Sequence, residues 1–364
     1  MKRLTGGKAE IILPALAFFL ALAGVVNAYS ATYYYPSQGL SVYMKQTVWI
    51  AVGFLIMVSV SWMQETHLEE ISYGFYVVLV ISLVAVLLFG RVVGGARRWI
   101  VFGPVSFQAS ELGKILFILA ISRYFSDRFT TNGMELKDLL VPFLMTIVPF
   151  LLIAAQPDLG TGGIYVLIFL GISFIALLRV GSVSKIVISG LVVIPVLWTM
   201  MKGYQKQRVL TFLNPEKDPF GAGYHIIQSK IAIGSGGLWG KGFLRGTQGQ
   251  LRFLPEQHTD FAFSVVAEEW GFLICLAILI LFLLFITRVF YIARQVNDRY
   301  SSFVISGIGI YFLLQVFINM AMVMGMFPVV GVPLPFISYG GSSMIANMFA
   351  LGIVINLSKH RHLL

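Results

Sequence analysis

The chain has 364 residues, of which 58% are hydrophobic and 12% charged, and its mean hydropathy is +0.86. Soluble domains carry roughly 25% charged residues, so the composition excludes an ordinary soluble protein and predicts a polytopic membrane protein. The net charge of +10 is better explained by basic cytoplasmic loops and a pocket for an anionic lipid than by nucleic acid, and a single cysteine, Cys275, excludes an internal disulfide.

The first apolar run follows the basic N-terminal residues and resembles a signal peptide. It continues to about Tyr29, longer than a signal peptide needs, so we expect an uncleaved transmembrane helix. A span needs about 20 apolar residues. Applied along the chain, this length predicts an all-α fold of about ten transmembrane helices in one membrane domain, residues 1–364, at 10–30, 46–63, 71–90, 109–125, 138–156, 160–178, 182–201, 262–288, 302–326 and 340–358.

The distribution of Lys and Arg predicts the orientation. With a cytoplasmic N-terminus, the inside termini and short loops hold thirteen Lys and Arg, and the short outside loops hold four. The positive-inside rule therefore predicts that both termini are cytoplasmic. The long loop 202–261 is then external, and three arginines, Arg91, Arg97 and Arg98, lie outside against the trend, as a ligand-binding cluster would.

The external loop 202–261 is predicted to be structured rather than a linker. Residues 222–233 have apolar positions at helical spacing, which predicts short amphipathic or re-entrant helices. The glycine-rich stretch 234–249 would permit tight turns and bring backbone N–H groups close to a phosphate. It does not match the spacing of a Walker A motif, so a nucleotide site is not expected.

Two polar groups precede and open the fourth span. Arg97, Arg98 and Trp99 form a basic and aromatic group at the outer surface, which would either anchor the protein at the interface or bind a pyrophosphate. Glu111 and Lys114 stand three residues apart, a spacing that allows a local ion pair. Alternatively, Lys114 reaches a central cavity, where it would hold a phosphate or pair with Asp260.

The carboxylates of the outer loops are the main candidates for chemistry. Asp158 lies in a tight turn between the fifth and sixth spans, where a turn-forming role is favoured. Asp260 stands before the eighth span, where it would cap the helix, act in catalysis, or do both. Two further carboxylates, Glu268 and Glu269, lie two turns deeper. Each would either form an ion pair with an inward-facing Arg or Lys or belong to the site, because carboxylates near hydrocarbon usually mark a site.

Supporting residues surround these candidates. Glu256 adds a further charge, and His258 is interpreted as support for Asp260, because His225 and His258 are too far apart in sequence to indicate zinc. The segment from Ser338 to Ser343 begins the tenth span, where small residues favour close helix packing. The alternative is that hydroxyls such as that of Ser342 face the cavity.

Six motifs follow one another along the chain: GGARRW (94–99), QASE..K (108–114), QPDLGT (156–161), LPEQHTDF (254–261), AEEWG (267–271) and PFISYGGSS (335–343). Together they resemble the SEDS family (shape, elongation, division and sporulation; the RodA/FtsW/SpoVE proteins), and residues 207–237 resemble its rod-shape members in particular. One departure is Ala109, where the family pattern has proline; its loss removes a preferred first helical residue.

The resemblance implies a processive glycosyltransferase that polymerises lipid II into peptidoglycan during cell elongation, outside the bacterial cytoplasmic membrane. It implies ten spans, places the catalytic aspartate on Asp260, and implies a class B penicillin-binding protein, other elongation-complex proteins and membrane lipids as partners. Inverting transfer would release undecaprenyl pyrophosphate. Arg97, Arg98 and Lys114 are the candidates for stabilising it, with a divalent cation (Mg²⁺ or Mn²⁺) left open. The competing hypotheses are a lipid II flippase and a non-catalytic scaffold of the wall-synthesis complex.

Overall fold

The computed structural model describes residues 6–33, 36–93, 96–103, 105–129, 136–176, 199, 203–217, 221–251, 253–254 and 256–359. Short 3₁₀ turns occur at Leu136–Leu139 and Pro215–Lys217. The α-helices of the described residues are α1 (Gly6–Thr32), α2 (Pro36–Ser61), α3 (Glu65–Glu70), α4 (Ser72–Phe89), α5 (Ala109–Arg128), α6 (Leu140–Ala155), α7 (Leu159–Ile175), α9 (Gly203–Leu213), α10 (Ala222–Gly236), α11 (Thr247–Gln250), α12 (Ala262–Ala293), α13 (Arg299–Val323) and α14 (Gly341–Ser358).

The predicted membrane architecture is confirmed as an α-helical bundle. Within the described residues, seven helices are long and apolar enough to cross a membrane, and α7 is apolar but shorter. Helices lie at nine of the ten predicted spans; α5 carries too many charged residues to read as a purely apolar span. The remaining span, 182–201, falls outside the described residues apart from Thr199, so the count of ten stays a prediction.

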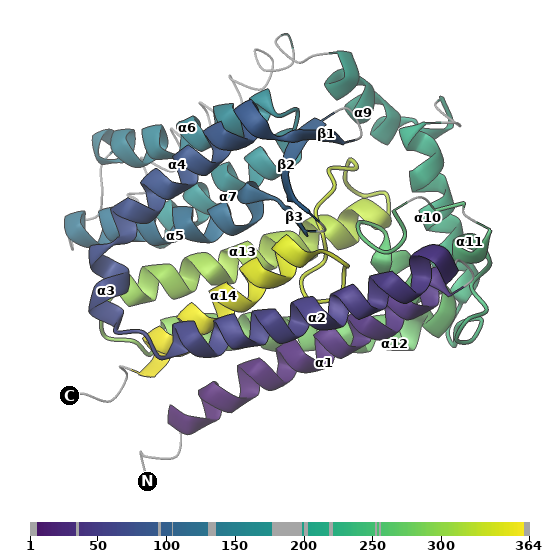
Figure 1. Ribbon diagram of the computed structural model, residues 1–364, viewed down its shortest axis with the longest axis horizontal. Coiled ribbons are helices and arrows are strands. Elements are labelled where there is room, and N and C mark those ends of the chain that lie inside the picture. Colours follow the sequence, from purple (N-terminus) through teal and green to yellow (C-terminus); the bar gives the residue numbers. More distant parts are fainter. Residues whose placement is uncertain are drawn as a thin grey trace.

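The core of the bundle lies around α13 and α14. In their most apolar windows, 72% of the α13 residues and 83% of the α14 residues are buried, against 22% in α4. Helix α13 packs against α5, α7, α12 and α14, while α1 and α2 pack beside one another (Figure 1). The start of α1 and the end of α14 lie at the same end of the bundle, opposite α9, α10 and α11 (Figure 1).

A small sheet between α4 and α5 was not predicted from the sequence. Strands β1 (Arg91–Val93), β2 (Ala96–Phe102) and β3 (Val105–Phe107) pair antiparallel in the order β1-β2-β3. Successive side chains of a strand point to opposite faces, so Arg97 and Arg98 cannot both face the same ligand. The sheet therefore divides a basic cluster that the sequence presents as one group.

Helix α12 is broken where the sequence predicts a continuous span. Gly271 has φ +73° and ψ −173°, a conformation that only glycine adopts readily. The chain around Gly240 passes so close that a Cβ on Gly271 would lie 2.2 Å from the Gly240 nitrogen. In the break, Lys241 N and Gly242 N donate to the carbonyls of Glu268 and Glu269, at 3.0 and 2.9 Å. The long loop that precedes α12 thus inserts into this helix immediately after its two carboxylates.

Candidate active site

Asp260 lies in a turn, residues 256–260, that leads into α12. Phe261 N donates to the Glu256 carbonyl (3.3 Å) and closes the turn. The N-cap of α12 is Phe261, which forms no side-chain cap, so the prediction that Asp260 caps this helix is wrong. Its side chain is available for another role.

The carboxyl group of Asp260 has an unusual electrostatic environment. A Cβ on Gly331 would lie 3.2 Å from Asp260 Oδ2, and Gly331 has φ +71°, so backbone lies directly against the carboxylate. Although the residue is partly exposed, its carboxyl group is largely removed from water. This desolvation raises the pKa of Asp260 to about 7, reinforced by Glu256, Asp158 and Glu111 and opposed by Arg98.

Arg98 and Asp158 form the second part of the site. Arg98 Nε lies 3.5 Å from Asp158 Oδ2, and the Arg98 guanidinium also donates to the Pro157 carbonyl. Asp158 caps α7 as the turn-forming prediction proposed, accepting from Thr161 N at 3.4 Å and Thr161 Oγ1 at 3.0 Å. The Arg98 side chain remains 23% exposed, so it can still meet an anion from solvent.

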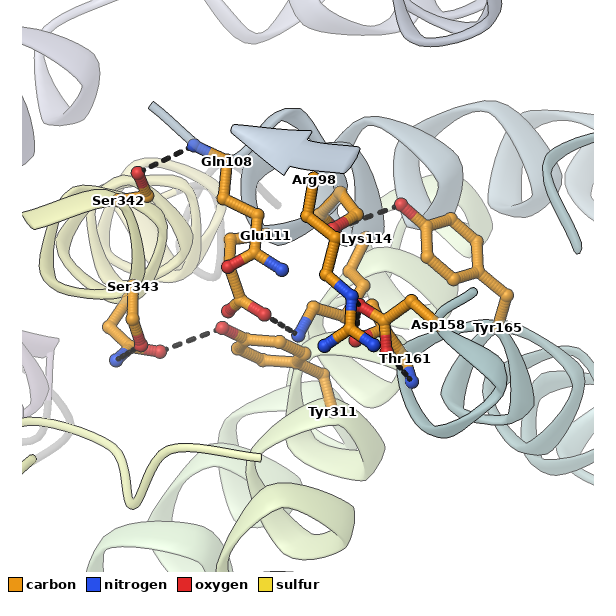
Figure 2. A network of polar contacts seen from close by, with 12 residues as sticks. Arg98, Gln108, Glu111, Lys114, Asp158, Thr161, Tyr165, Tyr311, Ser342 and Ser343 are labelled. Atoms are coloured by element: carbon orange, nitrogen blue, oxygen red, sulfur yellow. Dashed lines mark hydrogen bonds and ion pairs between the residues drawn. The ribbon is translucent and has the colours of Figure 1, made fainter. Parts of the chain in front are cut away.

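Glu111 and Lys114 form the third part, on the first turns of α5. Lys114 Nζ donates to Glu111 Oε1 at 2.8 Å, so the predicted local ion pair is confirmed. Lys114 is 1% exposed and lies 5.5 Å from the centroid of the Tyr311 ring. Figure 2 shows the Glu111–Lys114 pair beside the Tyr311 ring, and the burial of Lys114 keeps its ammonium group away from solvent.

Arg97 and Trp99 lie apart from this group. Arg97 Nη1 donates to the Leu87 carbonyl at 2.8 Å, and its side chain is exposed on the other face of β2. Trp99 pairs with Arg91 across the β1–β2 ladder and is partly exposed. Of the predicted pyrophosphate-binding arginines, only Arg98 contacts the residues around Asp260, because strand alternation turns its neighbour away.

Glu268 and Glu269 hold the long loop before α12 instead of supporting Asp260. Glu268 is fully buried and accepts from Lys241 Nζ (2.6 Å), Thr247 N (2.8 Å) and Gln248 N (3.1 Å). Glu269 Oε1 accepts from Ser30 Oγ of α1 at 2.5 Å. The loop N–H groups that were predicted to approach a phosphate therefore bind one of the protein's own carboxylates.

Substituting Glu268 with Gln is expected to loosen residues 241–250. The Gln amide keeps one acceptor oxygen, but its NH₂ group faces loop donors that bind a carboxylate oxygen in the wild type. Hydrogen bonds to a charged group contribute about 1.5–3 kcal/mol to stability, so part of this is lost. Amide hydrogen exchange across 241–250 should rise roughly 10–100-fold. An exposed carboxylate on α3, Glu70, supplies the control substitution to Gln. Unchanged exchange would show that the contacts to Glu268 do not hold the loop.

Three supporting residues take distinct places. Ser342 Oγ accepts from Gln108 N at 2.9 Å, joining the start of α14 to the start of α5. The ring of His258 lies tilted beside that of Tyr339, with centroids 5.8 Å apart, and burial lowers the pKa of its imidazole. Glu256 is exposed and accepts from Thr259 Oγ1 at 3.1 Å.

Sequence reasoning missed two residues that touch Asp260. Gly331 lies in the loop between α13 and α14, where the pattern gives no sign of proximity. Asn319 Nδ2 donates to the Asp260 carbonyl at 3.0 Å. The available signal for Asn319 was an amide inside an apolar run, since polar groups there are usually functional, and the structure shows this amide fully buried.

The described residues contain no group of three or more His, Cys, Asp or Glu side chains placed to hold a metal ion. The protein groups described do not by themselves make a divalent cation site.

Comparison with known proteins places this geometry in context. Residues 10–363 match the FTSW_RODA_SPOVE family model, described as cell cycle protein. The chain is 42% identical over 345 residues to the peptidoglycan glycosyltransferase MrdB of Escherichia coli K12, covering 92% of this chain and 91% of that one. It is 33% identical to the peptidoglycan glycosyltransferase RodA of Treponema pallidum, covering 88% and 90%.

Solved structures show the same fold. A chain from a peptidoglycan synthase complex, described as coordinating polymerization and crosslinking, aligns with a TM-score of 0.82 and 29% identity, covering 96% of this chain and 98% of that chain. The rod shape determining protein RodA of Thermus thermophilus aligns with a TM-score of 0.71 and 28% identity, covering 96% of both.

Proposed function

The chain belongs to the FtsW/RodA/SpoVE family of cell cycle proteins, and from this membership we infer that it is a peptidoglycan glycosyltransferase that polymerises lipid II during cell elongation. The observation that carries the mechanism is the Asp260 carboxyl, which is desolvated against Gly331 and is acted on by the positive charge of Arg98. A sugar hydroxyl is a poor nucleophile at neutral pH, and a base with a pKa near 7 is matched to that pH.

In the proposed reaction, the 4-hydroxyl of the acceptor sugar attacks the anomeric carbon of the donor. The new C1–O4 bond forms as the bond between C1 and the pyrophosphate oxygen breaks, and the hydroxyl proton passes to Asp260. Attack opposite the leaving group inverts the anomeric centre, so no carboxylate nucleophile is needed. Undecaprenyl pyrophosphate leaves as an anion.

Arg98 is the cation best placed to stabilise the leaving pyrophosphate. It is partly exposed, its charge acts on the Asp260 carboxyl, and its planar guanidinium can bind phosphate oxygens in pairs. Asp158 holds one edge of that guanidinium and so fixes its direction. Lys114 is buried, and its charge balances that of Glu111. A divalent cation bound through the pyrophosphate would add to the same stabilisation.

The cellular setting is proposed from charge and similarity. The positive-inside rule supports cytoplasmic termini and an active site that faces outward from the bacterial cytoplasmic membrane. The start of α1 and the end of α14 lie together, away from α9 to α11, which agrees with that topology (Figure 1). The similar chain within a synthase complex supports a class B penicillin-binding protein as the transpeptidase partner.

The test is polymerisation by the purified protein, with a class B penicillin-binding partner and labelled lipid II. Glycan ladders on a gel would support the polymerase. Without ladders, and with the partner confirmed bound, movement of lipid II across vesicle membranes would support the flippase instead.

The polymerisation rate should depend on pH through Asp260. The base acts only when it is unprotonated, so kcat should fall about tenfold per pH unit below about 7 and level off above it. Because Glu256 raises the pKa of Asp260, Glu256→Gln should move this acid limb to lower pH, whereas Glu70→Gln on α3 should not. Initial rates between pH 5.5 and 9 measure the limb, with thermal stability followed at each pH. If kcat instead began to fall only near pH 4, Asp260 would not be a general base with a raised pKa.

A further inference from the structure

The backbone of the Asp260 turn is held by donors from outside it. Three consecutive carbonyls each accept a hydrogen bond from α13 or from the segment between α13 and α14. Tyr339 N donates to His258 (2.8 Å), Ser338 Oγ to Thr259 (2.6 Å) and Asn319 Nδ2 to Asp260 (3.0 Å). Within the described part of the chain, these bonds connect the turn to residues 59 to 81 positions further on.

Two of these donors are themselves fixed. Asn319 is fully buried in α13, and its Nδ2 also donates to the Val332 carbonyl at 2.7 Å. Ser338 Oγ accepts from Leu334 N at 2.9 Å while it donates to Thr259. Since Val332 follows Gly331, the Asn319 amide sets both the peptide of Asp260 and the backbone that lies against its carboxylate. The Asn319 side chain therefore fixes both the backbone that bears the Asp260 carboxyl and the backbone that packs against it.

The same segment continues to the other half of the site. Four residues after Ser338, Ser342 binds Gln108 N at the start of α5. Helix α5 carries Glu111 and Lys114 on its first turns. The segment 334–342 therefore joins the Asp260 turn to the buried ion pair, and it determines how far apart they lie.

A structural role alone does not account for Asn319. An amide in the apolar part of the bundle is costly, and the Oδ1 of Asn319 has no hydrogen-bond partner among the described residues. Packing in the same space could be achieved by Leu. What the amide adds is two directed donors, one of them to the residue that bears the reacting carboxyl. Catalytic groups must be held within a fraction of an ångström of the productive position.

We propose that Asn319 and Ser338 are positioning residues for glycan polymerisation, forming with Tyr339 N a carbonyl clamp that holds Asp260 in its reactive place. This inference rests on the proposed role of Asp260 as general base. The clamp does not touch substrate. It acts through the turn, by keeping the carboxyl against Gly331 and within reach of the acceptor hydroxyl.

The clamp also explains how the carboxyl stays out of water. Asp260 faces Glu256 on its own turn, Arg98 on β2, Asp158 before α7 and Glu111 on α5. Releasing the turn lets the carboxyl rotate away from Gly331 toward solvent while those neighbours stay where they are. Its pKa should then move down toward the ordinary value, because desolvation is the largest cause of its rise.

The experiment compares Ser338→Ala, Ser338→Thr and Asn319→Ala in the lipid II polymerisation assay. Asn356→Ala is the matched control, because Asn356 of α14 is buried and its Nδ2 also donates to two carbonyls, those of Val60 (2.9 Å) and Met63 (2.6 Å). Displacement of about 1 Å costs about 10²-fold, so we expect Asn319→Ala and Ser338→Ala to lower kcat 10–100-fold with little change in KM.

The fall of kcat at low pH, the acid limb, is the measurement that a purely structural defect would leave unchanged. In Asn319→Ala and Ser338→Ala it should shift to lower pH, and Ser338→Thr, which keeps the hydroxyl, should restore both kcat and the limb. Asn356→Ala should lose comparable thermal stability with kcat and limb unchanged. Wild-type kcat in both Asn319→Ala and Ser338→Ala, or an equal loss of kcat in Asn356→Ala, would overturn the clamp. If Asp260→Asn is inactive in the same assay, the role of Asp260 as the base would still stand. Polymerisation by Asp260→Asn would overturn both proposals.

Discussion

Replacing Asp260 with Asn is expected to lower glycan polymerisation by about 10²–10⁴-fold, the usual contribution of a positioned general base. Asn has nearly the shape of the protonated carboxyl but cannot accept the proton of the acceptor hydroxyl. The Asp260 backbone bond to Asn319 does not involve the replaced group, so the turn should keep its place. Ladder formation from labelled lipid II measures the loss, with Glu70→Gln as a control substitution on the distant helix α3.

The stability of the same variant identifies the cause of any loss. In the folded protein the pKa of Asp260 is raised from 3.8 to about 7, so wild type is most stable, as far as this group is concerned, below pH 4 and loses that stability as the pH rises through 7. Asn removes the buried charge. The thermal midpoint of Asp260→Asn should therefore exceed that of wild type at pH 8 and approach it at pH 4. A variant that is inactive and less stable at pH 8 would contradict this account.

Breaking the Glu111–Lys114 pair is expected to have the largest effect on stability. Lys114 is 1% exposed and Glu111 4%, so Lys114→Met leaves a buried carboxylate without its cation, at a cost of about 3–5 kcal/mol. The double variant Glu111→Gln, Lys114→Met removes both charges and should recover most of that loss. Thermal and denaturant unfolding in one detergent would measure the two singles and the double.

Polymerisation by the double variant separates a structural pair from a functional one. Glu111 Oε2 has no hydrogen-bond partner among the described residues, and the charge of Glu111 acts on Asp260. We therefore expect the polymerisation activity of the double variant to stay at least tenfold below wild type even when its stability returns. Buried charges in a membrane protein are costly and usually serve a function. Full recovery of activity with stability would show that the pair only supports the fold.

The site is assembled from segments that are distant in sequence. Asp260 comes from the turn before α12, Arg98 from β2, and Asp158 from the turn before α7. Glu111 lies on α5, and Gly331 on the loop after α13. Each of these residues except Gly331 belongs to a motif that can be recognised in the local sequence. The role of Gly331 depends on the contact that its loop makes with Asp260 in the folded chain.

The sequence alone determined the membrane class, the positions of the helices and most of the site. Apolar runs of about 20 residues have few stable alternatives in lipid, because each backbone polar group must be satisfied within the segment. For a related reason, Asp158, Glu111, Lys114 and Asp260 stood out, since a charged group beside hydrocarbon is expensive and seldom incidental. The local pair of Glu111 with Lys114 followed from spacing along one helix face.

Only the tertiary structure decided how the remaining polar residues are used. Arg97 and Arg98 are adjacent in sequence, but an unpredicted strand turns them to opposite faces. Glu268 and Glu269 could have served Asp260 in an unbroken helix, but the break at Gly271 admits a loop whose donors take both carboxylates. Asn319 reaches Asp260 across 59 residues. A local sequence pattern indicates the type of secondary structure and which polar groups are costly to bury. The partner of each buried polar group depends on which backbone segment, distant in sequence, packs against it.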